Sequence, residues 1–210
     1  MDMNNGKLTN SGGITDMDGD ILIEGINEVK PDVYLEIGTG IGSSTDVIFN
    51  YLIEEFPNCE FYTIDINPDT IREVIEKYNS YSNFNAILGL SVKKNELVSR
   101  AKKKCGRYRG TEDVLRKVLL NMAEVNKKVD VCFIDSIRGS ALSEFKIIIN
   151  YLKENGIIFC HDILNGGKGV EIKEYLDVNK DKFEYEIIDT GTTTISEKQV
   201  KPGMMRIRLK

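Results

Sequence analysis

One glycine-rich stretch governs the architecture of the chain: Val33-Tyr34-Leu35-Glu36-Ile37-Gly38-Thr39-Gly40-Ile41-Gly42-Ser43-Ser44. An apolar run carries an acidic residue near its end, glycines follow at every second position, and small hydroxyl residues then open a helical pattern. This order predicts a buried strand, a tight turn and a helix N-terminus. Glycine has no Cβ, so a ligand can approach the backbone of the turn, and the unpaired N–H groups of the helix beyond it attract anions.

Strands and helices alternate around this stretch. The expected strands lie at about 32–37, 60–65, 85–88, 129–135, 156–161, 183–188 and 204–209, and helices are expected over about 21–29, 43–56, 68–79, 142–152 and 169–182, with a long basic helical region over 91–128. Near-continuous apolar strands in such an alternation are typical of a parallel sheet covered by helices on both faces. The last two strands are joined only by a loop around 191–202, so they should pair antiparallel. The predicted fold is α/β: a Rossmann-like doubly wound sheet of about seven strands, mostly parallel, with an antiparallel C-terminal hairpin.

Composition narrows the functional classes. The chain has 210 residues with 41% hydrophobic residues and a net charge of -5, which favours one globular domain over a disordered chain or a binder of polyanions. We expect residues 1–15 to form a flexible segment and residues 16–210 to form the single domain. With no membrane-length apolar run, no signal peptide and four scattered cysteines, a cytoplasmic protein is expected. The basic stretch over 93–109 is interpreted as a solvated helix face rather than a nucleic-acid site.

Polar residues end the predicted parallel strands. Asp65 ends the second strand, Asp135 the fourth, and His161-Asp162 the fifth, while Ser91 closely follows the third. Ligands of such sheets bind at the carboxyl ends of the strands, and a carboxylate at the position of Asp65 can accept hydrogen bonds from ribose hydroxyls. Strand ends are often polar because they meet solvent, but the joint pattern favours a nucleoside-binding site.

From about residue 20 the chain resembles the class I S-adenosylmethionine (SAM)-dependent methyltransferases. It is most similar to the small-molecule O-methyltransferases grouped with catechol O-methyltransferase, macrocin O-methyltransferase and cephalosporin hydroxylase. The resemblance implies SAM as cofactor, a small-molecule hydroxyl as methyl acceptor and a possible homodimer. The cofactor-binding residues that it implies are Glu36, Gly38, Thr39, Gly40, Gly42, Ser44, Asp65, Ile66, Ser91 and Asp135.

The same resemblance implies a metal site, because Asp135 matches an aspartate that ligates Mg²⁺ in the metal-dependent members. His161 and Asp162 match their second acidic pair, although neutral imidazole suits Mn²⁺ better than Mg²⁺. Two carboxylates that face one site repel each other unless a cation or proton intervenes. We therefore expect Asp135, His161 and Asp162 to bind Mg²⁺ or Mn²⁺ weakly, with Asn165 as a further candidate ligand. If no ion binds, His161 becomes the candidate general base.

Arg138 departs from the family pattern. The catechol enzymes carry a lysine at this position and the antibiotic group often carries a histidine. Arginine stays protonated in proteins, so Arg138 cannot take a proton, but it can bind an anionic substrate or a phenolate. The predicted catalytic set is His161, Asp135 and Arg138. Two alternatives stay open at this point: an NAD-dependent oxidoreductase on a similar sheet, and a SAM-binding relative without catalysis.

Overall fold

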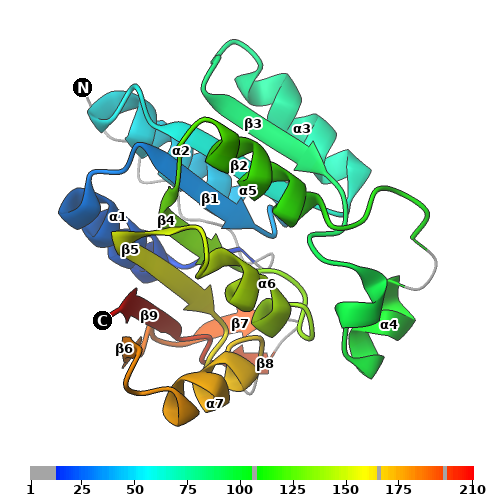
Figure 1. Ribbon diagram of the computed structural model, residues 1–210, viewed down its shortest axis with the longest axis vertical. Coiled ribbons are helices and arrows are strands. Elements are labelled where there is room, and N and C mark those ends of the chain that lie inside the picture. Colours follow the sequence, from blue (N-terminus) through cyan, green and yellow to red (C-terminus); the bar gives the residue numbers. More distant parts are fainter. Residues whose placement is uncertain (1–12, 106–107, 165–166, 196–197) are drawn as a thin grey trace.

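A computed structural model describes residues 13–105, 108–164, 167–195 and 198–210 of the chain. Its main feature is a seven-stranded sheet in the order β3-β2-β1-β4-β5-β9-β6 (Figure 1). The strands are β1 (Val33–Ile37), β2 (Glu60–Asp65), β3 (Phe84–Leu88), β4 (Val129–Ile134), β5 (Leu152–His161), β6 (Phe183–Ile188) and β9 (Met204–Leu209). Strands β1 to β5 run parallel, and β9 is antiparallel to both β5 and β6. The predicted fold class and the predicted C-terminal pairing are confirmed.

Helices cover both faces of the sheet. They are α1 (Asp16–Val29), α2 (Ser43–Glu55), α3 (Pro68–Tyr78), α4 (Ser99–Cys105), α5 (Val114–Glu124), α6 (Ala141–Ile148) and α7 (Val170–Val178), with one short 3₁₀ turn, η1 (Lys94–Glu96). Alternate residues of β1 face opposite cores: Val33 and Leu35 pack with α5, α6 and α7, whereas Tyr34 packs with α1, α2 and α3. A strand buried on both faces in this way accounts for its unbroken apolar sequence. Among the described residues, no helix is both long and apolar enough to cross a bilayer.

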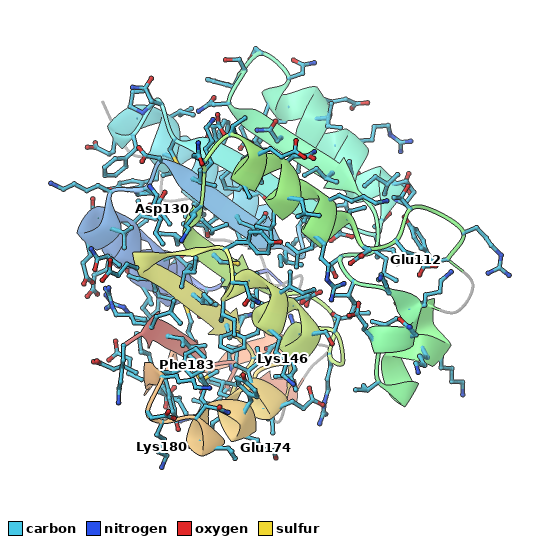
Figure 2. The ribbon with its side chains drawn as sticks, in the orientation of Figure 1. Glu112, Asp130, Lys146, Glu174, Lys180 and Phe183 are labelled. Carbon is cyan, nitrogen blue, oxygen red and sulfur yellow. The ribbon has the colours of Figure 1, made fainter. Side chains whose placement is uncertain are left out.

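An aromatic cluster joins the C-terminal elements to the rest of the sheet. The ring centroid of Phe183, the first residue of β6, lies 5.7 Å from that of Phe145 on α6 and 6.1 Å from that of Tyr175 on α7. The ammonium of Lys146 on α6 lies 4.9 Å from the Tyr175 ring centroid. Figure 2 labels Lys146 and Phe183 in this part of the molecule. These contacts pack α7 against α6 and against the start of β6.

The prediction of a long helical region over 91–128 was wrong in part. Only η1, α4 and α5 are helical there, and Leu90 forms an isolated parallel bridge with Glu112. Leu90, Val92 and Leu97 are all buried, and their spacing of two and then five residues does not fit one face of a helix. The segment therefore takes an irregular path along the edge of the core, and α4 lies beyond the carboxyl ends of the strands (Figure 1).

Several smaller features also differ from the predictions: α1 begins at Asp16 instead of about 21, and α6 ends at Ile148 instead of about 152. Strand β5 begins at Leu152, earlier than expected, because Leu152 pairs with Val129 before a register shift in the ladder. Helix α7 ends at Val178 instead of about 182. The predicted loop over 191–202 contains a short antiparallel ribbon, β7 (Thr193–Ile195) with β8 (Lys198–Val200). Most of the predicted flexible segment, residues 1–15, lies outside the described residues; within its described part Ile14 is buried and Thr15 caps α1.

Candidate active site

The glycine-rich turn passes directly against the end of β4. Gly38 has φ of 99°, and its N–H donates to the carbonyl of Ile64 at 2.9 Å. A Cβ on Gly38 would lie 2.5 Å from the carbonyl oxygen of Asp135, so no larger residue fits without a backbone shift. Gly42 has φ of 82° and precedes the first residue of α2, which has no side-chain N-cap among the described residues. The turn thus presents bare backbone and an uncapped helix N-terminus to the same space.

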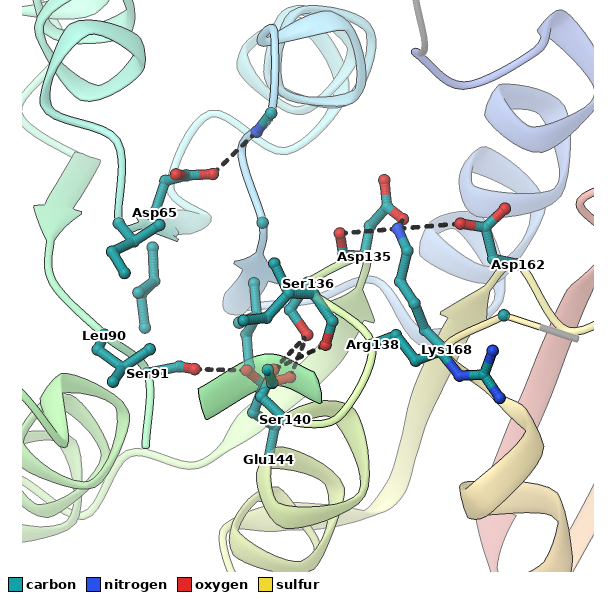
Figure 3. Close-up of a pocket in the computed structure, with 18 of the residues that line it drawn as sticks. Asp65, Leu90, Ser91, Asp135, Ser136, Arg138, Ser140, Glu144, Asp162 and Lys168 are labelled. Atoms are coloured by element: carbon teal, nitrogen blue, oxygen red, sulfur yellow. Dashed lines mark hydrogen bonds and ion pairs between the residues drawn. The ribbon is translucent and has the colours of Figure 1, made fainter. Parts of the chain in front are cut away.

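Asp65 ties this turn to the end of β2. Its Oδ2 accepts the N–H of Gly40 at 3.0 Å and its Oδ1 accepts the N–H of Asn67 at 2.7 Å. The carboxylate lies on the cleft side of the strand end, beside the turn (Figure 3). Charge-assisted bonds to two backbone N–H groups fix the carboxylate in place. Asp65 is therefore a fixed acceptor at the mouth of a cleft.

A cleft of about 900 Å³ opens at the carboxyl ends of the strands, where β1 and β4 mark the reversal of strand order. This is the position at which open α/β sheets bind their ligands. Helix α4 contributes Ala101 and Lys103 to its wall. The predicted site residues that line the cleft are Gly38, Gly40, Asp65, Ile66, Ser91, Asp135, Arg138 and Asp162.

The other predicted site residues do not line the cleft: Thr39 and Gly42 are buried members of the turn, and Glu36, Ser44 and His161 are buried outside the lining. Glu36 is 1% exposed and accepts hydrogen bonds from the hydroxyls of Ser44, Thr45 and Thr63 at 2.5, 2.5 and 2.6 Å. Burial raises the pKa of Glu36 to about 7, and the three hydroxyl donors offset only part of this effect. In the structure Glu36 and Ser44 support the turn from below, with the Ser44 hydroxyl committed to Glu36.

Glu144 is a site residue that the sequence did not single out. It projects from α6 to the floor of the cleft, is fully buried, and accepts hydrogen bonds from the hydroxyls of Ser91, Ser136 and Ser140 (Figure 3). Burial raises the pKa of its carboxyl, and the serine donors counteract this only in part. The i, i+4 spacing of Ser140 and Glu144 was the signal in the sequence that could have indicated a contact between them. The contact with Ser91 could not be inferred in this way, because Ser91 lies on a distant segment.

His161 lies between two carboxylates. Its Nδ1 is 3.1 Å from Oδ1 of Asp135 and its Nε2 is 3.3 Å from Oδ2 of Asp18. Asp18 is fully buried and also accepts the backbone N–H of Thr15 at the start of α1. Burial lowers the pKa of His161, but the charge of Asp135 and the hydrogen bonds to both aspartates outweigh it and raise the pKa to about 10.

The position of His161 bears on two expectations. Both ring nitrogens face aspartate carboxylates, and this environment favours the protonated imidazole, which has no lone pair to offer. It also stands outside the lining of the cleft, behind Asp135. In this arrangement His161 is held between Asp135 and Asp18, and its predicted roles as general base and metal ligand stay predictions.

Lys168, to which the sequence analysis assigned no role, reaches the predicted metal position. Its ammonium contacts the carboxylate of Asp135, lies 3.1 Å from the carbonyl oxygen of Asp135, and lies 3.1 Å from Oδ2 of Asp162 (Figure 3). Asp162 has φ of 62°, a left-handed conformation that is uncommon for aspartate and that ends β5 abruptly. The predicted candidate ligand Asn165 lies outside the described residues.

The charges of this cluster hold one another ionised. Burial raises the pKa of Asp135, but Lys168 and His161 outweigh it and bring the pKa below its usual value. Burial lowers the pKa of Lys168, and Asp135 and Asp162 more than compensate. Arg138, on the loop after β4, is exposed at the cleft wall and offers a further positive charge to a ligand.

Comparison with known proteins agrees with this geometry. Residues 35–163, well over half of the chain, match the family model described as a methyltransferase domain. The fold is similar to that of an O-methyltransferase from Bacillus cereus solved with S-adenosylhomocysteine (SAH), at 14% identity and a TM-score of 0.66 over 95% of this chain and 84% of that one. It is also similar to TomG from Streptomyces achromogenes, an O-methyltransferase of tomaymycin synthesis solved with SAM, at 12% identity and a TM-score of 0.66 over 94% and 82%.

A third structure shares the same architecture: the SAH-bound methyltransferase PaMTH1 from Podospora anserina, at 18% identity and a TM-score of 0.60 over 94% of this chain and 80% of that one. No curated protein matches the chain. The family model begins inside β1 and ends just after Asp162, so it spans the glycine-rich turn, Asp65 and Asp135. This chain belongs to the methyltransferase-domain family, and its fold is that of the class I SAM-dependent methyltransferases.

Proposed function

We propose that this protein transfers the methyl group of SAM to a hydroxyl oxygen of a small molecule. The observation that carries the proposal is the fixed carboxylate of Asp65 beside the glycine-rich turn, at the rim of a cleft of about 900 Å³. The family match supports methyl transfer. The SAM- and SAH-bound O-methyltransferases of the same fold support the cofactor and the oxygen acceptor.

The chain's residues suggest how the cofactor is held. Asp65 accepts the ribose hydroxyls, in keeping with a strand-end carboxylate at this position of the sheet. The uncapped N-terminus of α2 attracts the carboxylate of the methionine moiety. Ile66 and Ser91 line the same cleft as Asp65 and border the adenine. Glu36 and Ser44 act indirectly, because they support the turn that makes these contacts.

Bound SAM supplies an electrophilic methyl group. The chain must then place a deprotonated acceptor oxygen in line with it, and positioning of this kind provides much of the rate of such reactions. Asp135 and Asp162 face the cleft near the turn, and Arg138 stands at the wall, where it can pair with an anionic group of the acceptor. Arg138 cannot accept the acceptor's proton, so its role is to bind charge.

A divalent metal does not fit the described site as it stands. The ligand atoms of Asp135, His161 and Asp162 lie within 4.8 Å of one another, as the sequence led us to expect. However, Lys168 contacts both carboxylates, and both nitrogens of His161 face aspartates. The proposed mechanism therefore routes no step through Mg²⁺ or Mn²⁺.

Other features of the proposal follow from the sequence. We place the enzyme in a reducing compartment such as the cytoplasm, in keeping with four buried cysteines. A single catalytic domain over 16–210 and a homodimer stay predictions of the family resemblance. The family match favours methyl transfer over the oxidoreductase alternative. Only a measurement of methyl transfer distinguishes the proposed enzyme from a relative that binds SAM without catalysis.

Calorimetric titration with SAH and, separately, with NAD tests the cofactor. We expect SAH to bind in the micromolar range, about -8 kcal/mol, and NAD to show no heat of binding. Tight binding of NAD without binding of SAH would contradict the proposal. Incubation with methyl-labelled SAM and a panel of hydroxylated metabolites, with and without Arg138→Met, then identifies acceptors and tests the preference for anionic ones.

A further inference from the structure

The carboxylates of Asp135 and Asp162 already share a cation that belongs to the chain. The ammonium of Lys168 has three N–H donors, and the structure gives it three oxygen acceptors: the Asp135 carboxylate, the Asp135 carbonyl and Asp162 Oδ2. The donor set of the lysine is therefore fully used. Asp135 and Asp162 are the oxygen ligands that a divalent ion at this place would need.

The remaining predicted ligand is also committed. His161 directs Nδ1 to Asp135 and Nε2 to Asp18, so each ring nitrogen already has a carboxylate partner. Asp18 is fully buried and holds its own place through the cap of α1, which keeps the imidazole from turning. An incoming ion would have to displace Lys168, and the third candidate ligand, His161, already pairs with two aspartates.

Local structure keeps Lys168 in position. It sits between Gly167 and Gly169 just before α7, and only about a fifth of its side chain is exposed. A Cβ on Gly169 would lie 3.0 Å from the side chain of Ile163, so the segment is packed closely against the residue that follows Asp162. The residue after Lys168 is therefore held close to the end of β5.

We propose that Lys168 is the resident cation of the Asp135–Asp162 pair, that it replaces the divalent metal of the metal-dependent relatives, and that this enzyme binds no divalent ion there. The ammonium neutralises the pair and holds both carboxylates in fixed positions at the cleft. The role of this cation in catalysis rests on the proposed methyl transfer. The claim that Lys168, and not a divalent ion, neutralises Asp135 and Asp162 does not depend on the substrate.

Manganese binding tests the inference without a substrate. Electron paramagnetic resonance measures the Mn²⁺ that stays free in the presence of the protein. The wild-type protein should bind no Mn²⁺ up to millimolar concentrations. Lys168→Met removes the ammonium and leaves two unneutralised carboxylates, so it should bind Mn²⁺ at least about tenfold more tightly than the wild type. Adding Asp162→Asn to Lys168→Met should abolish that gain. Lys173→Met, an exposed lysine of α7 that pairs with Asp177, is the matched control and should behave as the wild type.

Two results would overturn the inference. One is a Mn²⁺ site in the wild type that Asp162→Asn removes, and this measurement needs no lysine variant. The other is a folded Lys168→Met protein that binds Mn²⁺ no more tightly than the wild type. If circular dichroism shows that Lys168→Met is unfolded, Lys168→Gln is tested in its place. SAH titration of the same samples tests the proposed function separately, since loss of SAH binding would leave the Mn²⁺ comparison intact.

Discussion

Asp65 is bonded on both carboxylate oxygens to backbone N–H groups of different loops, and this fixes it at the rim of the cleft. Asp65→Ala should weaken SAH binding by about 1.5–3 kcal/mol, or about 10- to 100-fold, because it removes charge-assisted bonds to the ribose. Calorimetry gives the affinity directly. Asp69→Ala is the control, since Asp69 is exposed and pairs only with Arg72 nearby. Unchanged affinity in a folded Asp65→Ala protein would place the nucleoside elsewhere.

Glu36 gives the stability of the protein a pH dependence. Its pKa is raised from 4.5 to about 7 in the folded state, so the folded protein holds this proton more tightly than the unfolded chain. The free energy of unfolding should therefore fall as the pH rises from about 4.5 to about 7, with a contribution of about 3 kcal/mol from this group. Glu36→Gln is neutral at every pH and should lose this component.

Urea unfolding at pH 5, 6, 7 and 8 measures the Glu36 effect. The difference in unfolding free energy between wild type and Glu36→Gln should change steadily from pH 5 to pH 7 and then level off. Glu124→Gln, at an exposed position of α5, should give a curve parallel to that of the wild type. Parallel curves for Glu36→Gln would show that the buried carboxyl has an ordinary pKa.

At the scale of elements, α1 packs on β5 through a glycine. A Cβ on Gly25 would lie 2.4 Å from the ring of Phe159, which is fully buried. On the same helix, a Cβ on Gly19 would make an ordinary contact with Val47 at 3.4 Å. The close approach of Gly25 to Phe159 holds α1, which carries Asp18, against β5, which ends in His161. The packing of α1 therefore also affects the position of the site residues.

Gly25→Ala and Gly19→Ala together measure this packing. Both substitutions gain about 1 kcal/mol of helix propensity, so their difference isolates the close approach. Gly25→Ala should be less stable than Gly19→Ala by about 1–3 kcal/mol, the usual cost of overpacking. Chemical denaturation of both variants and the wild type gives the values. Equal stabilities would mean that α1 can shift away from β5 without loss.

At the scale of the whole molecule, cofactor binding should stabilise the fold because the cleft joins turns from β1, β2, β4 and β5. At a SAH concentration 100 times the dissociation constant, mass action adds about 2.7 kcal/mol, which corresponds to a rise in Tm of about 5–10 °C for a chain of this size. Scanning calorimetry with increasing SAH should show this rise for the wild type. At the same SAH concentration Asp65→Ala should show a clearly smaller rise, and equal rises would contradict a ribose contact through Asp65.

The sequence by itself determined the parallel sheet, the glycine-rich turn and the carboxylate at the end of β2. Apolar periodicity and turn chemistry are local, since each depends on residues a few positions apart, and the ends of parallel strands must meet at one edge of the sheet. Asp65, Asp135 and Asp162 could therefore be assigned to one region of the molecule from the sequence alone. The irregular path over 91–128 was missed because its apolar residues follow the core and not a helical period.

Only the tertiary structure decided the charge pattern of the site. Asp18 meets His161 across 143 positions of sequence, and Lys168 meets Asp135 across 33. Such contacts depend on how α1 packs on β5 and how the segment before α7 turns back to the cleft, which no local pattern encodes. The residue types predicted a cation between two carboxylates, because like charges need one. Packing decided that the cation is the chain's own lysine.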